Sequence, residues 1–179
     1  TVEVIAGAAT QLPLSTEPTD TVRNNIVFPT QPVVQLRDVS GNDVSDADVT
    51  VTLATTAGGG TLSGDTMITT NAQGTATFAD LSILGTVGER VFAYSASGLT
   101  SAVDTMQLIA GTLSSLVIDR HPSSGAVGVP FAVQPIVQLS DMTGNPVKQE
   151  GVKVEGRVFS GGGRLVGDTI VTTDADGKA

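Results

Sequence analysis

Apolar and polar residues alternate along most of the chain in short runs, and this period of two predicts β-strands. The clearest run places Val49, Val51 and Leu53 on one face of a strand and Thr50, Thr52 and Ala54 on the other. Gly, Pro, Asn and Ser clusters separate the runs. Over the first 110 residues, strands are predicted at 11–15, 30–37, 49–54, 61–63, 65–70, 75–78, 89–95 and 100–109. Short strands at this spacing predict an all-β fold, a sandwich of two sheets.

The chain contains an internal repeat. Residues 31–42 return almost unaltered as residues 134–145, and the two segments read QPVVQLRDVSGN and QPIVQLSDMTGN. The same shift of 103 residues carries Gly58–Gly60 onto Gly161–Gly163 and Thr69–Thr70 onto Thr172–Thr173 without a gap. The sequence therefore predicts two tandem domains of one kind.

The repeat also predicts the domain boundaries. Residues 1–7 match residues 105–111, which suggests the last strand of a preceding domain or an N-terminal extension. Residues 8–110 form one complete sandwich. Residues 111–179 form a second sandwich that is incomplete, because Ala179 matches Ala76 and counterparts of residues 77–110 do not follow. The last strands would have to come from further residues or from a neighbouring chain, since an uncovered apolar edge invites pairing.

Composition narrows the function classes. With no Trp, one Tyr and five Phe, the core must be built from Val, Leu, Ile and Ala. The net charge of −9 and only nine Lys and Arg argue against nucleic acid and anionic membrane surfaces as partners. The absence of Cys excludes disulfides, thiolate metal sites and thiol catalysis. No apolar run approaches the roughly 20 residues of a direct membrane span.

The order of the repeated motifs resembles the bacterial immunoglobulin-like repeats (Big-type) that occur in tandem in surface proteins such as invasin and intimin. The motifs are Gln35 to Asn42, Val49-Thr50-Val51, Gly59 to Leu62, Thr69 to Ala76, and the strand from Gly88 to Ala96. The resemblance implies immunoglobulin-like β-sandwich domains that serve as stalks, spacers or binding surfaces. The Cys pair and core Trp of antibody domains are absent, as is usual in the bacterial group.

Two motifs contain residue types found in catalytic or phosphate-binding sites, but their spacing does not match such sites. His121 is followed by Ser123 in a Pro- and Gly-rich loop, but nothing in the sequence orients an imidazole against the hydroxyl. The triple glycines lack the Lys-Ser/Thr of a phosphate-binding loop and predict a strand bend or bulge. We therefore predict no catalytic and no cofactor-binding residues. Paired acids for glycoside hydrolysis are also not expected, because the aromatic sugar platforms are missing.

Carboxylates are the remaining candidates for a metal site. Asp38 and Asp43 lie in a turn between two strands, and Asp174-Ala175-Asp176-Gly177 resembles part of a calcium loop. Calcium takes six to eight oxygen ligands, and the closing Glu of the EF-hand pattern is missing. Asx turns are the alternative for all four acids. The sequence thus favours no metal, with Asp38, Asp43, Asp174 and Asp176 as the calcium candidates.

These features predict a non-catalytic structural or protein-interaction module of an exported bacterial protein, periplasmic or on the cell surface. Its tandem repeats would act as an adhesin-type stalk or spacer. The alternative is an extrinsic periplasmic scaffold subunit that docks on a larger membrane protein complex and stabilises it. Expected partners are proteins of the cell envelope or of a membrane complex, or a second copy of the chain through its sheet edges.

Overall fold

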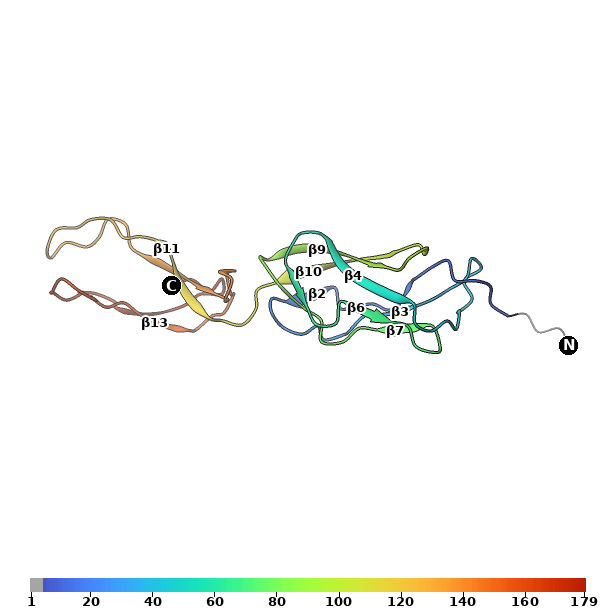
Figure 1. Ribbon diagram of the computed structural model, residues 1–179. Coiled ribbons are helices and arrows are strands. Elements are labelled where there is room, and N and C mark those ends of the chain that lie inside the picture. The colour runs from blue at the N-terminus through green and yellow to red at the C-terminus, as the bar shows by residue number, and fades with distance from the viewer. Residues whose placement is uncertain (1–4) are drawn as a thin grey trace. The chain divides into compact units, whose positions relative to one another are not determined.

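The computed structural model describes residues 5–179, and the chain divides into two compact units after Ile109. Every regular element of the described residues is a β-strand, which confirms the all-β class (Figure 1). No helix in this part of the chain is long and apolar enough to cross a membrane. The strands of the first unit are β1 (Leu14–Thr16), β2 (Thr21–Arg23), β3 (Val33–Gln35), β4 (Thr50–Ala57), β5 (Thr61–Ser63), β6 (Met67–Thr69), β7 (Thr75–Thr77), β8 (Ser82–Leu84), β9 (Gly88–Ser95) and β10 (Ala102–Ile109).

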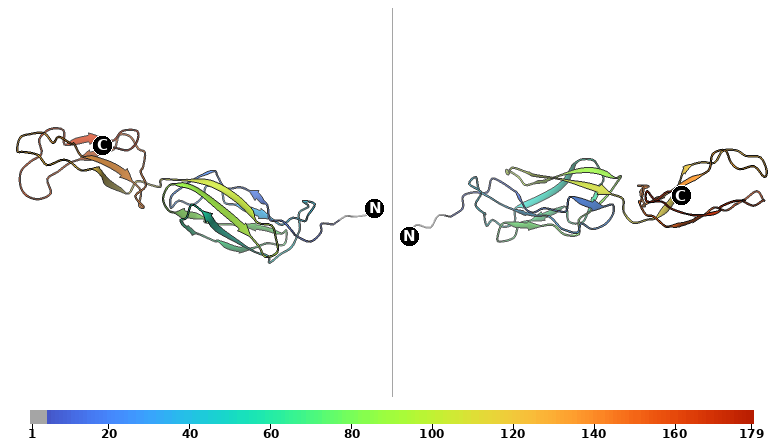
Figure 2. Two further views of the ribbon diagram at one scale, coloured as in Figure 1. Left: turned by 90° about the horizontal axis from the view of Figure 1, so that it is seen from above. Right: turned by 180° about the vertical axis from the view of Figure 1, so that it is seen from behind.

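The first unit is a β-sandwich. One sheet has the strand order β2-β10-β9-β4-β6, the other has the order β1-β3-β7, and β5 pairs with β8 separately. All pairs are antiparallel except β2 with β10. The three long strands of the larger sheet lie side by side in Figure 2, and Figure 1 shows β3 and β7 on the opposite side of the unit from β9.

The core lies between these two sheets and follows the predicted alternation. In β9, Phe92 and Tyr94 are fully buried, whereas Val91 and Ala93, which alternate with them, are half-buried. The Phe28 and Phe92 ring centroids are 6.2 Å apart, and Phe78 meets Tyr94 edge-on at 5.5 Å. Aliphatic side chains fill the remaining core, namely Leu12, Val22, Val34, Leu36, Val51, Leu53, Leu81, Ile83, Met106 and Leu108.

Two strands of the first unit were not predicted. β2 lies between the predicted strands at 11–15 and 30–37, and β8 lies between those at 75–78 and 89–95. Each has three residues with one buried apolar side chain, Val22 or Ile83, so no alternation is visible in the sequence. The first predicted strand begins at Leu14 and not at Gln11, which makes only isolated bridges to Thr100 and Arg37. It lies at a sheet edge, as Pro13 indicates.

One glycine turn recurs in both units because a side chain has no room there. Gly74 follows β6 with φ of 72°, and a Cβ at this position would lie 1.8 Å from the Val44 carbonyl oxygen. Gly177 repeats the arrangement with φ of 74° and a distance of 2.0 Å to the Val147 carbonyl oxygen. Positive φ and backbone contact together require glycine at both positions.

The second unit contains two separate strand pairs. β11 (Ser115–Arg120) pairs with β12 (Ile136–Ser140), and β13 (Lys153–Glu155) pairs with β14 (Ile170–Thr172). The registers repeat those of the first unit, since Ile118 faces Val137 as Leu14 faces Val34. Of the predicted N-terminal strand at 1–7, residues 1–4 lie outside the described residues and residues 5–7 are not in a strand.

Apolar side chains are more exposed in the second unit. Leu116 is 52% exposed, whereas Leu12, its counterpart in the first unit, is 1% exposed. Ile118 is exposed as well, at the position where half-buried Leu14 packs against the core of the first unit. An apolar hollow of about 320 Å³ lies among Leu113, Ser114, Ser115, Leu116, Leu139 and Val152. The second unit thus presents apolar surface that its counterpart buries.

Phe92→Ala tests the packing of the first unit. Removing this fully buried ring should lower the free energy of unfolding by about 3–5 kcal/mol, because the cavity is added to the lost burial. Tyr94 is the only Tyr and there is no Trp, so tyrosine fluorescence during urea denaturation follows the first unit alone. Val103→Ala, at a side chain 64% exposed, is the matched control and should change stability by less than about 0.5 kcal/mol. A loss below about 1 kcal/mol for Phe92→Ala would contradict the described core.

Candidate functional site

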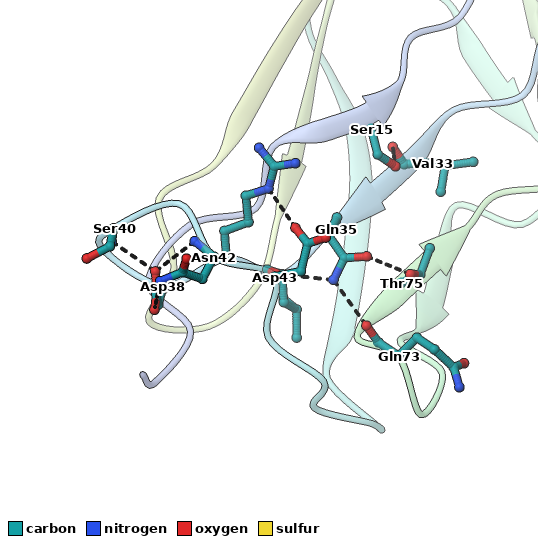
Figure 3. Close-up of polar contacts among 11 residues, drawn as sticks. Ser15, Val33, Gln35, Asp38, Ser40, Asn42, Asp43, Gln73 and Thr75 are labelled. Atoms are coloured by element: carbon teal, nitrogen blue, oxygen red, sulfur yellow. Dashed lines mark hydrogen bonds and ion pairs between the residues drawn. The ribbon is translucent and has the colours of Figure 1, made fainter. Parts of the chain in front are cut away.

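Asp38 lies three residues after the end of β3, is 5% exposed and accepts four hydrogen bonds. Its Oδ1 accepts hydrogen bonds from the backbone N–H groups of Ser40 (2.9 Å) and Asn42 (2.9 Å). Its Oδ2 accepts from Asn42 Nδ2 (3.0 Å) and from the Gly7 N–H (2.9 Å). Figure 3 shows Ser40 and Asn42 converging on this carboxylate. Asp38 therefore joins Gly7, which precedes β1, to the turn of Ser40 and Asn42, which follows β3.

These donors stabilise the charged form of the carboxylate. The side-chain hydrogen bond from Asn42, followed by the Gly7 and Asn42 N–H groups, lowers the pKa of Asp38 to about 2, while burial opposes the shift. Hydrogen bonding thus outweighs desolvation at this residue. The four donors occupy both oxygens, so the carboxylate has the environment of a structural anion and not of a general base.

The same turn occurs in the second unit around Asp141, which is 2% exposed. Its Oδ1 accepts from the N–H groups of Thr143 (2.9 Å) and Asn145 (3.0 Å) and from Thr143 Oγ1 (2.9 Å). Its Oδ2 accepts from Asn145 Nδ2 (2.9 Å) and from the Gly111 N–H (3.0 Å). Apart from the added Thr143 hydroxyl, each oxygen accepts from equivalent groups in both units. We call these two arrangements the aspartate turns.

A second repeated contact holds the strand that precedes each aspartate turn. Gln35 Nε2 donates to the carbonyl oxygens of Gln73 (3.1 Å) and Leu36 (3.2 Å), and Thr75 Oγ1 donates to Gln35 Oε1 (2.7 Å; Figure 3). Gln138 Nε2 makes the corresponding bonds to Asp176 and Leu139 at 3.0 and 3.1 Å. The roles of these glutamines and of the Gly7 and Gly111 amides were not predicted. The repetition of Gln and Asp in the motif was the available signal.

The other calcium candidates are held by different groups. Asp43 bonds Arg37 Nε at 2.9 Å on the surface of the same loop as Asp38. Asp174 Oδ1 accepts the N–H groups of Asp176 and Lys178, which makes an Asx turn, and Asp176 pairs with Lys148 at 3.1 Å. Within residues 5–179, no three His, Asp or Glu side chains are grouped so that they could hold a metal ion.

The remaining sequence candidates are His121, Ser123 and the two triple glycines. His121 is exposed, and Ser123 Oγ accepts the Val133 N–H at 3.1 Å. Gly58–Gly60 have φ values of 84°, 69° and 98° between β4 and β5, and Gly161–Gly163 repeat these positive angles in the second unit. The structure thus confirms the predicted bend and does not pair Ser123 with His121.

A shallow groove of about 470 Å³ runs along one edge of the first unit, lined by residues 11–14, Glu17 and residues 100–103. Beside the groove, burial raises the pKa of Asp104, and the charges of Glu17 and Asp20 raise it further. The hydrogen bond from the Thr105 N–H opposes this increase. Burial and the Asp104 charge raise the pKa of Tyr94. Tyr94 Oη and Asp104 Oδ2 have no hydrogen-bond partner within the described residues. A raised phenol pKa disfavours the phenolate form of Tyr94 at neutral pH.

Three comparisons place this geometry among known proteins. A family model described as SMCHD1 Ig-like domain 6 matches residues 7–110. A search of curated proteins finds no match. Among solved structures, FdeC, an Escherichia coli adhesin, is similar with a TM-score of 0.52 and 22% identity, over 94% of this chain and 56% of that one. This likeness is one of fold, and the chain spans about half the length of the FdeC structure.

Sugar-cleaving enzymes are similar over a smaller share. A β-glycosidase from Bacteroides vulgatus matches 57% of this chain at 12% identity with a TM-score of 0.47. A β-glucuronidase from Parabacteroides merdae matches 59% at 22% identity with a TM-score of 0.40. This chain covers 14% and 13% of those two chains, so their activities carry no argument here.

The lowered pKa of Asp38 predicts an acid-sensitive first unit. A carboxyl group with a folded pKa near 2 and an ordinary value of 3.8 adds stability that is complete above the ordinary value. This stability is lost as the pH falls through the folded value. The urea midpoint followed by Tyr94 fluorescence should therefore decrease between about pH 4 and pH 2, and Asp38→Asn should flatten this decrease. Asp43→Asn, at the exposed acid of the same loop, is the control and should keep the wild-type slope. Equal slopes in wild type and Asp38→Asn would contradict the assignment.

Proposed function

Because the chain belongs to the immunoglobulin-like domain family whose model describes SMCHD1 Ig-like domain 6, we propose that it is a non-catalytic structural and protein-interaction module. More specifically, we propose that it is a tandem array of bacterial Big-type repeats from an exported protein. The array acts as an adhesin-type stalk or spacer in the periplasm or on the cell surface.

The observation that carries the proposal is the use of the repeated polar side chains. Asp38 and Asp141 bond backbone of their own unit, and Gln35 and Gln138 do the same. A third repeated pair follows this rule, since Thr70 Oγ1 donates to the Asp46 carbonyl and Thr173 Oγ1 to the Gln149 carbonyl, both at 2.7 Å. In both copies these three kinds of side chain therefore stabilise the sandwich.

The tandem role is supported by the extent of the fold likeness. FdeC is named as an adhesin, and its similarity extends over 94% of this chain, which includes parts of both units. A series of sandwiches with short connections is suited to hold a binding surface away from its attachment point. Partners in this role are proteins of the cell envelope or of a target surface.

The alternative proposal is an extrinsic periplasmic scaffold subunit that docks on a membrane protein complex and stabilises it. The apolar exposure of Leu116 and Ile118 favours this alternative, because such surface is normally covered. The acidic chain would then meet the protein part of the complex and not its anionic lipids. Neither proposal includes a cofactor or a calcium ion, since the candidate acids already bond donors of the protein.

We also propose a domain division at residues 7/8 and 110/111. Residues 8–110 are a complete sandwich, and residues 111–179 are a second sandwich that needs more strands. The exposed Leu116 and Ile118 and the apolar hollow beside Leu139 support the last point.

Purification of the native protein in mild detergent, with mass spectrometry of what accompanies it, separates the two proposals. A stalk should be recovered without a stoichiometric membrane complex, whereas a scaffold subunit should be recovered with one. The experiment includes a salt wash as a control, because an extrinsic subunit held by polar contacts is released by salt. Turnover of a substrate by the purified chain would contradict both proposals.

A further inference from the structure

We propose that Asp38 and Asp141 are positioning residues that fix the entry of the chain into each sandwich. In each unit, one oxygen of the buried carboxylate holds the N–H of a glycine that precedes the first strand. The inference goes beyond the proposed function, because it concerns how each domain is joined to the chain before it.

The two contacts have the same geometry. Gly7 N–H donates to Asp38 Oδ2 at 2.9 Å, and Gly111 N–H donates to Asp141 Oδ2 at 3.0 Å. Residues 31 and 30 positions apart in sequence are joined in this way. The sequences around the contact differ between the two copies, yet the contact recurs in both. It is therefore not a coincidence of one loop.

The two carboxylate oxygens accept different groups of donors, and this explains why the residue is Asp. Oδ1 accepts the N–H groups of the turn itself, from Ser40 and Asn42 in the first unit. An Asn side chain could make these bonds with its single carbonyl oxygen. Oδ2 accepts the entry glycine and the Asn42 amide. Only a carboxylate supplies this second acceptor, so the entry contact and the Asn42 amide together explain a charge at a nearly buried position.

The contact at Asp141 leaves little free chain at the junction. β10 ends at Ile109, whose carbonyl oxygen accepts the Asn24 N–H at 2.9 Å. Gly111 is held by Asp141, and Ser114 N–H donates to the Ser140 carbonyl at 2.9 Å. Ala110 is the single residue between Ile109 and Gly111, whose backbone groups make these hydrogen bonds. The aspartate turn thus limits the number of rotatable backbone bonds at the junction, which is what a stiff spacer requires.

A crossed pair of variants in the full chain tests the proposal. Asp141→Asn retains the Oδ1 bonds and replaces Oδ2 by an NH₂ group that cannot accept the Gly111 N–H. Asp38→Asn does the same for Gly7, and each variant is the control of the other. The measurement is the ¹⁵N order parameter of the two glycine amides by NMR relaxation, with amide hydrogen exchange as a second readout.

In wild type, both glycine amides should have order parameters near the value of about 0.85 found for rigid backbone. Asp141→Asn should lower the value of Gly111 below about 0.6 and leave that of Gly7 unchanged, and Asp38→Asn should give the reverse. Exchange of the released amide should accelerate by at least about tenfold. Unchanged order at the variant's own glycine, or an equal loss at both glycines, would overturn the proposal.

Folding is checked separately in each unit. Tyr94 fluorescence reports the first unit, and the amide shifts of Ile136–Ser140 report the second. If Asp141→Asn unfolds the second unit, an ester in place of the Gly111 peptide N–H removes the donor and leaves the aspartate turn intact. The order of the Ala110 and Thr112 amides should then decrease, and unchanged order would overturn the proposal. The result is independent of the proposed function, which is judged by what purifies with the protein.

Discussion

A carboxylate removed from water needs compensation for its charge, and this requirement organises the entry end of both units. Asp38 and Asp141 are almost fully buried, and each is surrounded by N–H donors from its own loop and from the segment before the first strand. Leaving such a charge unpaired would cost several kcal/mol. The donors must therefore be in place whenever the domain is folded. A loop between strands and an incoming chain become one structure through a single side chain.

The packing of the core imposes a second constraint. With few aromatic residues available, Phe28, Phe78, Phe92 and Tyr94 pair between the sheets of the first unit, and aliphatic side chains fill the surrounding space. The polar residues repeated between the units bond backbone at the turns. These repeated polar side chains therefore contribute to the stability of the fold.

The all-β class, the sandwich and the long strands β4, β9 and β10 were predictable, because each strand shows alternation over several residues. The repeat located the aspartate turn in both copies. The strands β2 and β8 were not predictable, since three residues with one buried apolar side chain give no period. The contact of Asp38 with Gly7 was also out of reach, because it joins residues 31 positions apart and depends on the complete fold. Sequence patterns report local structure, whereas this site is formed by tertiary packing.

The two units differ in how completely their apolar faces are covered, although their repeated contacts are the same. In the first unit Phe92, Tyr94, Met106 and Leu108 of β9 and β10 cover the face. The described residues of the second unit include no counterpart of these strands, and Leu116 and Ile118 are exposed there. Adding the covering strands tests most directly whether both units are the same sandwich.

A copy of residues 77–110 placed after Ala179 continues the register in which Ala179 matches Ala76. The second unit should then unfold cooperatively, reported by its newly added tyrosine, and the chain should bind less of a dye specific for exposed apolar surface. The same graft with its copies of Phe92 and Leu108 replaced by Ser should not have these effects. Unchanged dye binding and no cooperative transition for the intact graft would contradict the claim that one sandwich is repeated in both units.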